Sequence, residues 1–228
     1  MSKRTLVILI GAALLFSAPA FAIDGQVLIN QSTVMAAGGF PYKITQPGSY
    51  KLSGNLAVAA ASTDAIDIET SNVTLDLNGF TISGPVTCTG SSSAISCEGR
   101  AGSGIANLGG QNNLTVRNGT VVGFQFGVDL CCVNELIEEI QTSGNSGDGI
   151  IIGSGVVWLT TASLNGGSGI YATYSTVMEN VASSNATNGL IGEVVAYGGN
   201  SFNFNGSAPT YVISPVSQGN NSCNGTAC

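Results

Sequence analysis

Apolar and polar residues alternate with a period of two in several short stretches of the chain. In residues 66–69 and 73–77, isoleucine, valine and leucine alternate with aspartate, glutamate and threonine, and residues 113–118 repeat the pattern. A period of two places successive side chains on opposite faces of a β-strand. No apolar pattern of period 3.6 lasts as long as a stable helix requires. The chain is therefore predicted to be all-β.

A repeat of twenty residues organises the C-terminal half. Four asparagines share this exact spacing: Asn145, Asn165, Asn185 and Asn205. A glycine followed by an aliphatic residue comes four positions after each of the first three: Gly149-Ile150, Gly169-Ile170 and Gly189-Leu190. Two columns with one spacing are expected when each repeat forms one turn of a solenoid, so that equivalent residues stack.

Earlier coils have the same glycine-aliphatic pair at looser spacing. Gly104-Ile105 and Gly127-Val128 precede Gly149 by 45 and 22 residues, and Ala65-Ile66 opens a coil 39 residues before Gly104. Removing residues 85–103, rich in glycine and serine, restores the period. We therefore expect a solenoid over residues 65–210, with about six to seven coils of roughly 20–23 residues and a loop insertion at 85–103.

The asparagine column has a physical purpose in such a solenoid. Each side-chain amide can bond the equivalent amide in the next coil and the local backbone as well. This satisfies polar groups at a partly buried corner, each of which would otherwise cost about 1–3 kcal/mol. We predict a structural ladder of Asn145, Asn165, Asn185 and Asn205.

Two segments carry a resemblance to a known fold. Residues 40–52 read Phe-Pro-Tyr-Lys-Ile-Thr-Gln-Pro-Gly-Ser-Tyr-Lys-Leu, and residues 67–79 read Asp-Ile-Glu-Thr-Ser-Asn-Val-Thr-Leu-Asp-Leu-Asn-Gly. With the repeats, they resemble the right-handed parallel β-helix of the pectate-lyase-like superfamily. The resemblance implies that fold. It also implies that an enzyme of this class acting on polysaccharide would use clustered aspartates, or arginine or lysine with calcium.

The two ends of the chain have their own patterns. Residues 1–22 have a basic start, an apolar run and an Ala-Phe-Ala site, which predicts a cleaved signal peptide and a secreted, periplasmic or cell-surface protein, with a bacterial style of signal. Residues 23–64 are expected to form an N-terminal cap and first strands. Residues 211–228 are expected to form a C-terminal cap or tail.

Charge narrows the range of partners. After residue 22 the chain has four basic residues against thirteen acids, a net charge near −9, and it contains no histidine. Nucleic acid and anionic membrane surfaces are disfavoured because both attract lysine and arginine. The absence of histidine excludes Ser-His-Asp catalysis and most zinc sites. A polar surface with few charges suits a polysaccharide or a cell-surface glycan.

Six cysteines lie after the signal segment, an even number typical of disulfides in an exported chain: Cys88, Cys97, Cys131, Cys132, Cys223 and Cys228. Proximity favours Cys88–Cys97 and Cys223–Cys228. Cys131 and Cys132 can form a vicinal bridge or remain free. Spacing alone does not fix the pairing.

Candidate catalytic residues lie early in the solenoid, in an acidic group of Asp64, Asp67, Glu69 and Asp76. Asp67 and Glu69 are expected about 7 Å apart on the outward side of one strand, a separation compatible with acid and base in an inverting hydrolase. A polar, solvated strand face is the favoured explanation, because outward strand positions need polar residues. Arg117 should neighbour Asp76 one coil later, as an ion pair or as a ligand for an acidic sugar.

Two further groups have simpler explanations. Glu135, Glu138 and Glu139 can hold calcium only if they share a face, which the alternation does not allow, so a solvated turn is expected and no cofactor is required. Aromatic residues recur on the C-terminal coils at Trp158, Tyr171, Tyr174 and Tyr197. They either fill the interior or form an exposed strip that stacks on sugar rings. The favoured function is an exported, non-catalytic carbohydrate-binding or surface module. A small polysaccharide lyase or hydrolase, or a self-associating structural element, are the alternatives.

Overall fold

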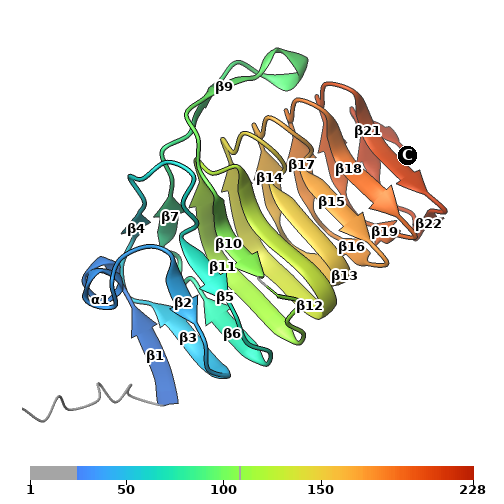
Figure 1. The fold of residues 1–228 in the computed structure, drawn as a ribbon. Helices are drawn as coiled ribbons and strands as arrows, with labels where there is room; N and C mark the ends of the chain where they lie inside the picture. Colours follow the sequence, from blue (N-terminus) through green and yellow to red (C-terminus); the bar gives the residue numbers. More distant parts are fainter. Residues whose placement is uncertain (1–24, 108) are drawn as a thin grey trace, which may run out of the picture.

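The protein is a β-solenoid of about nine turns, with mostly parallel strands (Figure 1). The computed structural model describes residues 25–107 and 109–228, and the predicted signal peptide lies outside them. The prediction of an all-β parallel solenoid is confirmed, whereas the predicted six to seven coils are too few. The handedness of the coil remains a prediction.

The strands stack in three columns, which we number in the order in which each coil runs through them from its glycine-aliphatic pair. Column 1 contains β2 (Tyr42–Ile44), β5 (Ile66–Ile68), β10 (Ser103–Asn107), the start of β12 (Phe126–Ser143), the start of β13 (Ile150–Trp158), β15 (Ile170–Thr173), β18 (Asn188–Glu193) and β21 (Ala208–Ile213). All of these neighbours pair in parallel.

The other two columns complete each coil. Column 2 contains β1 (Gln26–Ile29), β3 (Gly48–Leu52), β6 (Val73–Asp76), the start of β11 (Leu114–Val122), the middle of β12, the end of β13, β16 (Thr176–Met178), β19 (Ala196–Gly198) and β22 (Val216–Ser217). Column 3 contains β4 (Leu56–Ala57), β7 (Thr81–Ser83), the ends of β11 and β12, β14 (Thr161–Ser163), β17 (Val181–Ser183), β20 (Ser201–Asn203) and β23 (Ser222–Cys223).

The additional coils come from both ends of the chain. Strands β1 and β3 already pair in column 2, within the segment expected to be a cap. Strands β22 and β23 continue columns 2 and 3 within the expected tail. These end coils lack the glycine-aliphatic pair on which the count was based, and so the periodicity missed them.

Small elements finish the two ends. Helix α1 (Gln31–Ala36) begins with Asn30, whose side chain accepts a hydrogen bond from the backbone N–H of Thr33, and it buries Val34. At the other end β24 (Thr226–Ala227) folds back antiparallel on β23. None of the helices in residues 25–107 and 109–228 is long and apolar enough to cross a membrane.

The interior is a stack of aliphatic side chains. Ile66, which follows Ala65, and the residues that follow the repeat glycines form one fully buried row: Ile66, Ile105, Val128, Ile150, Ile170 and Leu190. Each buried side chain of this size contributes about 1.5–3 kcal/mol from removal of apolar surface from water. The glycine before each aliphatic residue leaves room for a neighbouring coil, because a Cβ at Gly169 would lie 2.8 Å from the Gly189 carbonyl oxygen.

Asparagine ladders join consecutive coils. The Asn145 amide donates to Asn165 at 2.9 Å, Asn165 to Asn185 at 3.0 Å, and Asn185 to Asn205 at 3.0 Å. A second ladder at the corner between columns 2 and 3 runs through Asn180, Asn200 and Asn221. The first three members of each series are buried, so the amides satisfy one another where water does not reach.

A disulfide hairpin leaves the solenoid between columns 3 and 1. Strands β8 (Thr87–Thr89) and β9 (Ser96–Glu98) pair antiparallel, and the Cys88–Cys97 bond joins them. The hairpin extends along the coils (Figure 1) until the Ser92 hydroxyl donates to the Phe204 carbonyl. The tip of the hairpin packs closely against the solenoid at Gly206, because a Cβ at this position would lie 2.7 Å from the Ser93 nitrogen.

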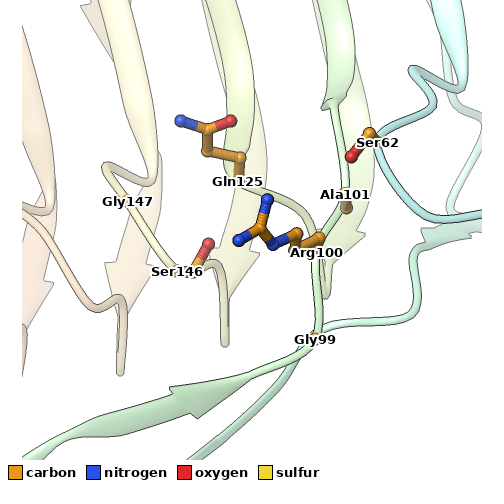
Figure 2. Close-up of a pocket in the computed structure, with 7 residues that line it drawn as sticks. All are labelled: Ser62, Gly99, Arg100, Ala101, Gln125, Ser146 and Gly147. Atoms are coloured by element: carbon orange, nitrogen blue, oxygen red, sulfur yellow. The ribbon is translucent and has the colours of Figure 1, made fainter.

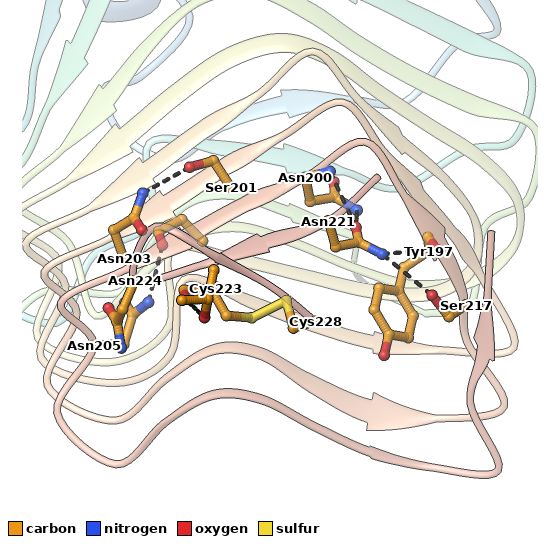
Figure 3. The surroundings of a disulfide bond; sticks show 12 residues. Tyr197, Asn200, Ser201, Asn203, Asn205, Ser217, Asn221, Cys223, Asn224 and Cys228 are labelled. Atoms are coloured by element: carbon orange, nitrogen blue, oxygen red, sulfur yellow. Dashed lines mark hydrogen bonds between the residues drawn. A yellow bond between two sulfur atoms is a disulfide. The ribbon is translucent and has the colours of Figure 1, made fainter. Parts of the chain in front are cut away.

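The second disulfide lies in the last coil. Cys223 and Cys228 are bonded next to the ends of the asparagine ladders, as Figure 3 shows. Both predicted pairings are thus confirmed. Cys131 and Cys132 are free thiols.

Candidate functional site

The outward side of column 1 changes character along the solenoid. The strand register aligns one outward residue per coil, in the order Lys43, Asp67, Ala106, Asp129, Ile151, Tyr171, Ile191 and Tyr211. The first half of this row is charged or small. The second half alternates isoleucine and tyrosine, and we call its residues Ile151, Tyr171, Ile191 and Tyr211 the tyrosine row.

Asp67 is the most perturbed carboxyl group at the acidic end. Its side chain is only 3% exposed, and its Oδ1 atom has no hydrogen-bond partner among the described residues. Burial, the charge of Asp64 and a side-chain hydrogen bond with Asp64 raise the pKa of Asp67 to about 6. A hydrogen bond between two carboxyl groups requires that one of them hold a proton.

Two more carboxyl groups extend the acidic end. Burial is the main cause that raises the pKa of Asp129, followed by the charges of Asp64 and Asp148. Burial also raises the pKa of Asp148, although this carboxylate accepts a hydrogen bond of 2.6 Å from the Ser168 N–H. Perturbed acids that gather in one place can mark a functional site. The burial of Asp67, however, keeps a polymer from reaching it.

The tyrosine row is accessible. Tyr171 is 39% exposed and Tyr211 is 60% exposed, while Ile151 and Ile191 between them are half-buried. The two tyrosines lie on alternate coils, which places them about 10 Å apart along the solenoid. Beside the row, a second outward row contains Thr173, Glu193 and Ile213. Chemically this half offers flat apolar rings with polar groups at the margin.

A polar pocket lies at the base of the hairpin, along the same edge of column 1. It has a volume of about 320 Å³ and is lined by Ser62, Gly99, Arg100, Ala101, Gln125, Ser146 and Gly147 (Figure 2). The Arg100 side chain extends over this pocket toward Gln125 and Ser146. The pocket adjoins the acidic end, because its lining residue Gly147 precedes Asp148 and its lining residue Ser62 lies two positions before Asp64.

The structure separates the predicted catalytic residues. Asp67 belongs to column 1, whereas Asp76 and Arg117 pair in column 2, with a 3.4 Å contact between guanidinium and carboxylate. Glu69 follows β5 and forms an ion pair of 2.6 Å with Lys43. The four candidates therefore do not converge on one site. The expected solvated face is also wrong for Asp67, because this residue is only 3% exposed.

The predicted solvated acidic turn is wrong for Glu135. This side chain is buried and accepts hydrogen bonds from the Asn107 amide at 3.1 Å and the Cys132 N–H at 2.9 Å. Glu138 instead lies outward, 3.9 Å from Arg117. No group of three or more histidine, cysteine, aspartate or glutamate side chains that could hold a metal ion occurs in the part of the chain that the structure describes.

The aromatic residues divide between interior and surface. Tyr197 is buried in the bore of column 2, and Trp158 lies one row away with 39% exposure. Tyr211 was not predicted as part of an aromatic strip, because it falls in the segment expected to form a cap or tail. The signal was nevertheless present, since residues 151, 171, 191 and 211 have the same twenty-residue spacing as the asparagines.

Comparison of the chain with protein-family models, with curated proteins and with solved structures finds no match. Its function must therefore be inferred from the geometry of its own surface.

Proposed function

We propose that the protein binds carbohydrate through the tyrosine row. The observation that carries this proposal is the position of two exposed tyrosines, Tyr171 and Tyr211, on alternate coils of one flat row. Aromatic rings of this kind pack against the apolar faces of sugar rings while the phenol hydroxyl bonds to sugar hydroxyls. In this proposal the protein is exported and resembles the pectate-lyase-like superfamily in fold.

Several features support a neutral extended glycan as the ligand. A solenoid gives a straight row with a constant rise per coil, which suits a linear polymer better than a compact ligand. Charged residues make up 8% of the chain, and the net charge is negative. Glu193 beside the row also disfavours an acidic sugar through like-charge repulsion.

The test is retention of the protein by a panel of insoluble and immobilised polysaccharides. Tyr171→Ala and Tyr211→Ala should each weaken binding by about 3- to 10-fold, the loss expected for one aromatic contact of about 0.5–1.5 kcal/mol. Trp158→Ala is the matched control, because Trp158 is as exposed as Tyr171 but lies in column 2. This control should bind as the parent protein does.

Three results would contradict the proposal. The polysaccharides could retain the Tyr171→Ala/Tyr211→Ala double variant as strongly as the parent protein. Trp158→Ala could weaken retention as much as Tyr171→Ala does. Alternatively, the same panel could yield new reducing ends or unsaturated products, with or without calcium. Activity that Asp67→Asn abolishes would replace binding by hydrolysis at the acidic end of column 1, and it would mean that a substrate reaches Asp67 despite its burial.

A further inference from the structure

The coil that contains Cys131 and Cys132 is longer than the coils after it. It spans 22 residues from Gly127 to Gly149, whereas the next two coils span 20 each. The strand register locates the two extra residues. Leu130 pairs with Ile152 and Glu135 with Gly155, so four residues on β12 face two on β13, with register shifts at this point.

This bulge changes the directions of the two cysteine side chains. Adjacent residues in a regular strand point to opposite faces of the sheet, which keeps neighbouring cysteines apart. Here the sulfur atoms of Cys131 and Cys132 lie 3.2 Å from each other. A bond of about 2.05 Å requires them to approach by only about 1.2 Å.

Hydrogen bonds hold the bulge in place. Buried Glu135 accepts the Cys132 N–H, and the Asn107 amide donates both to Glu135 and to the Gln111 carbonyl at 2.8 Å. A Cβ at Gly110 would lie 3.7 Å from the Cys132 sulfur, in ordinary contact. Cys131 is exposed and Cys132 half-exposed, so a small reagent can reach both thiols.

We propose that Cys131 and Cys132 form a site of reversible oxidation that closes as a vicinal disulfide inside the two-residue bulge. The oxidant is a small disulfide such as oxidised glutathione. One cysteine thiolate attacks it, releases one glutathione thiolate and forms a mixed disulfide. The neighbouring cysteine then attacks the protein sulfur of that bond and releases the second glutathione. The cysteines lose two electrons and two protons, and the reagent's disulfide is reduced.

The environment indicates the order of attack. Partial removal of the Cys131 sulfur from water, followed by the hydrogen bond and charge of Cys132, raises the pKa of Cys131 to about 11, although the residue as a whole is exposed. The Cys131 thiolate is therefore scarce at neutral pH, which disfavours Cys131 as the first nucleophile. Oxidation should accordingly be slow and should accelerate as pH rises.

The experiment measures intact mass and alkylation by iodoacetamide before and after treatment with oxidised glutathione. The other four cysteines are bonded, so alkylation reports only on this pair. Untreated protein should take two labels. Treated protein should take none and lose the mass of two hydrogen atoms, and a mild dithiol should restore both labels. The reduced form should also bind a trivalent arsenical, whereas Cys131→Ser should not.

Other outcomes would overturn the proposal. Two stable glutathione adducts, a covalent dimer, or two thiols that remain open to alkylation after long incubation would each show that the pair does not close. Cys132→Ser is the matched variant, and it should stop at a single glutathione adduct on Cys131 or remain unmodified. Unchanged circular dichroism of both serine variants would establish that each result concerns folded protein.

Discussion

At the scale of single residues, Asp67 and the asparagine ladders show two different ways in which this solenoid buries polar side chains. Asparagine side chains donate and accept in turn, so four of them stack along one corner without charge. A carboxylate only accepts, so two carboxyl groups placed together, such as Asp64 and Asp67, can form a hydrogen bond only while one of them holds a proton. The spacing of twenty predicted the first arrangement. No spacing predicted the second, because Asp67 and Asp64 are brought together by a corner of the coil and not by the repeat.

Asp67 should make stability depend on pH. Its pKa is about 6 in the folded protein and 3.8 as an ordinary value, so between these pH values the folded state binds more protons than the unfolded state. The free energy of unfolding therefore falls as pH rises from about 4 to about 6. We expect Asp67→Asn to raise stability by about 1–2 kcal/mol at neutral pH and to change it little near pH 4.

Urea unfolding at the two pH values measures this effect. An equal stabilisation at both would show that the substitution acts through packing and not through the proton. The asparagine side chain retains the size of aspartate, so no cavity complicates the comparison.

At the scale of elements, the hairpin β8–β9 is the main departure from the repeat. The broken period predicted a loop insertion at 85–103, and the structure places β8 and β9 within this range. The position of the hairpin over the later coils was not predicted, because this position depends on small residues far along the chain. Ser146, Gly166, Ala186 and Gly206 each follow a ladder asparagine and leave space beneath it.

The Cys88–Cys97 disulfide should stabilise the hairpin more than it stabilises the solenoid. In Cys88→Ser/Cys97→Ser we expect trypsin to cleave after Arg100 several-fold faster, because the loosened hairpin exposes its base. We expect the melting temperature to change by only a few degrees, since both cysteines are only partly buried and pack against the margin of the aliphatic interior. The rate of fragment formation and a calorimetric scan measure the two effects.

The control for this experiment is Cys223→Ser/Cys228→Ser, which leaves the hairpin intact and should not accelerate cleavage after Arg100. Collapse of the melting temperature in the hairpin variant would show instead that the solenoid depends on this bond to fold.

At the scale of the whole molecule, the repeat predicted the architecture and underestimated its length. The end coils lack the glycine-aliphatic pair, so a count based on that pair left them out. The candidate site was predicted less well. The early acids were chosen as candidates because they are charged. Tyr211 was assigned to a tail, although it lies forty residues, or two repeats, after Tyr171.

A solenoid of equal coils should tolerate loss of one complete coil. Deletion of residues 165–184 joins Leu164 to Asn185 and restores every column and the asparagine ladder. We expect a folded protein with a smaller urea m-value, in proportion to the surface that is lost. Circular dichroism and urea unfolding measure the result.

Deletion of residues 165–174, half a coil, is the matched control. It places polar residues in the bore and should prevent folding. Loss of structure in the complete-coil deletion as well would mean that individual coils are not interchangeable.

The reach of the hairpin has one more consequence. In a stacked array each layer touches only the next, so a disturbance at one end must travel through every layer between. The hairpin leaves after β7, and its tip meets Phe204 beyond β20, while β11, β12, β14 and β17 lie between those strands. The hairpin therefore joins an early coil directly to the coil that contains Phe204. Loosening of the coil that contains Phe204 can be felt at the Arg100 pocket, at the base of the hairpin, without passing through the intervening layers.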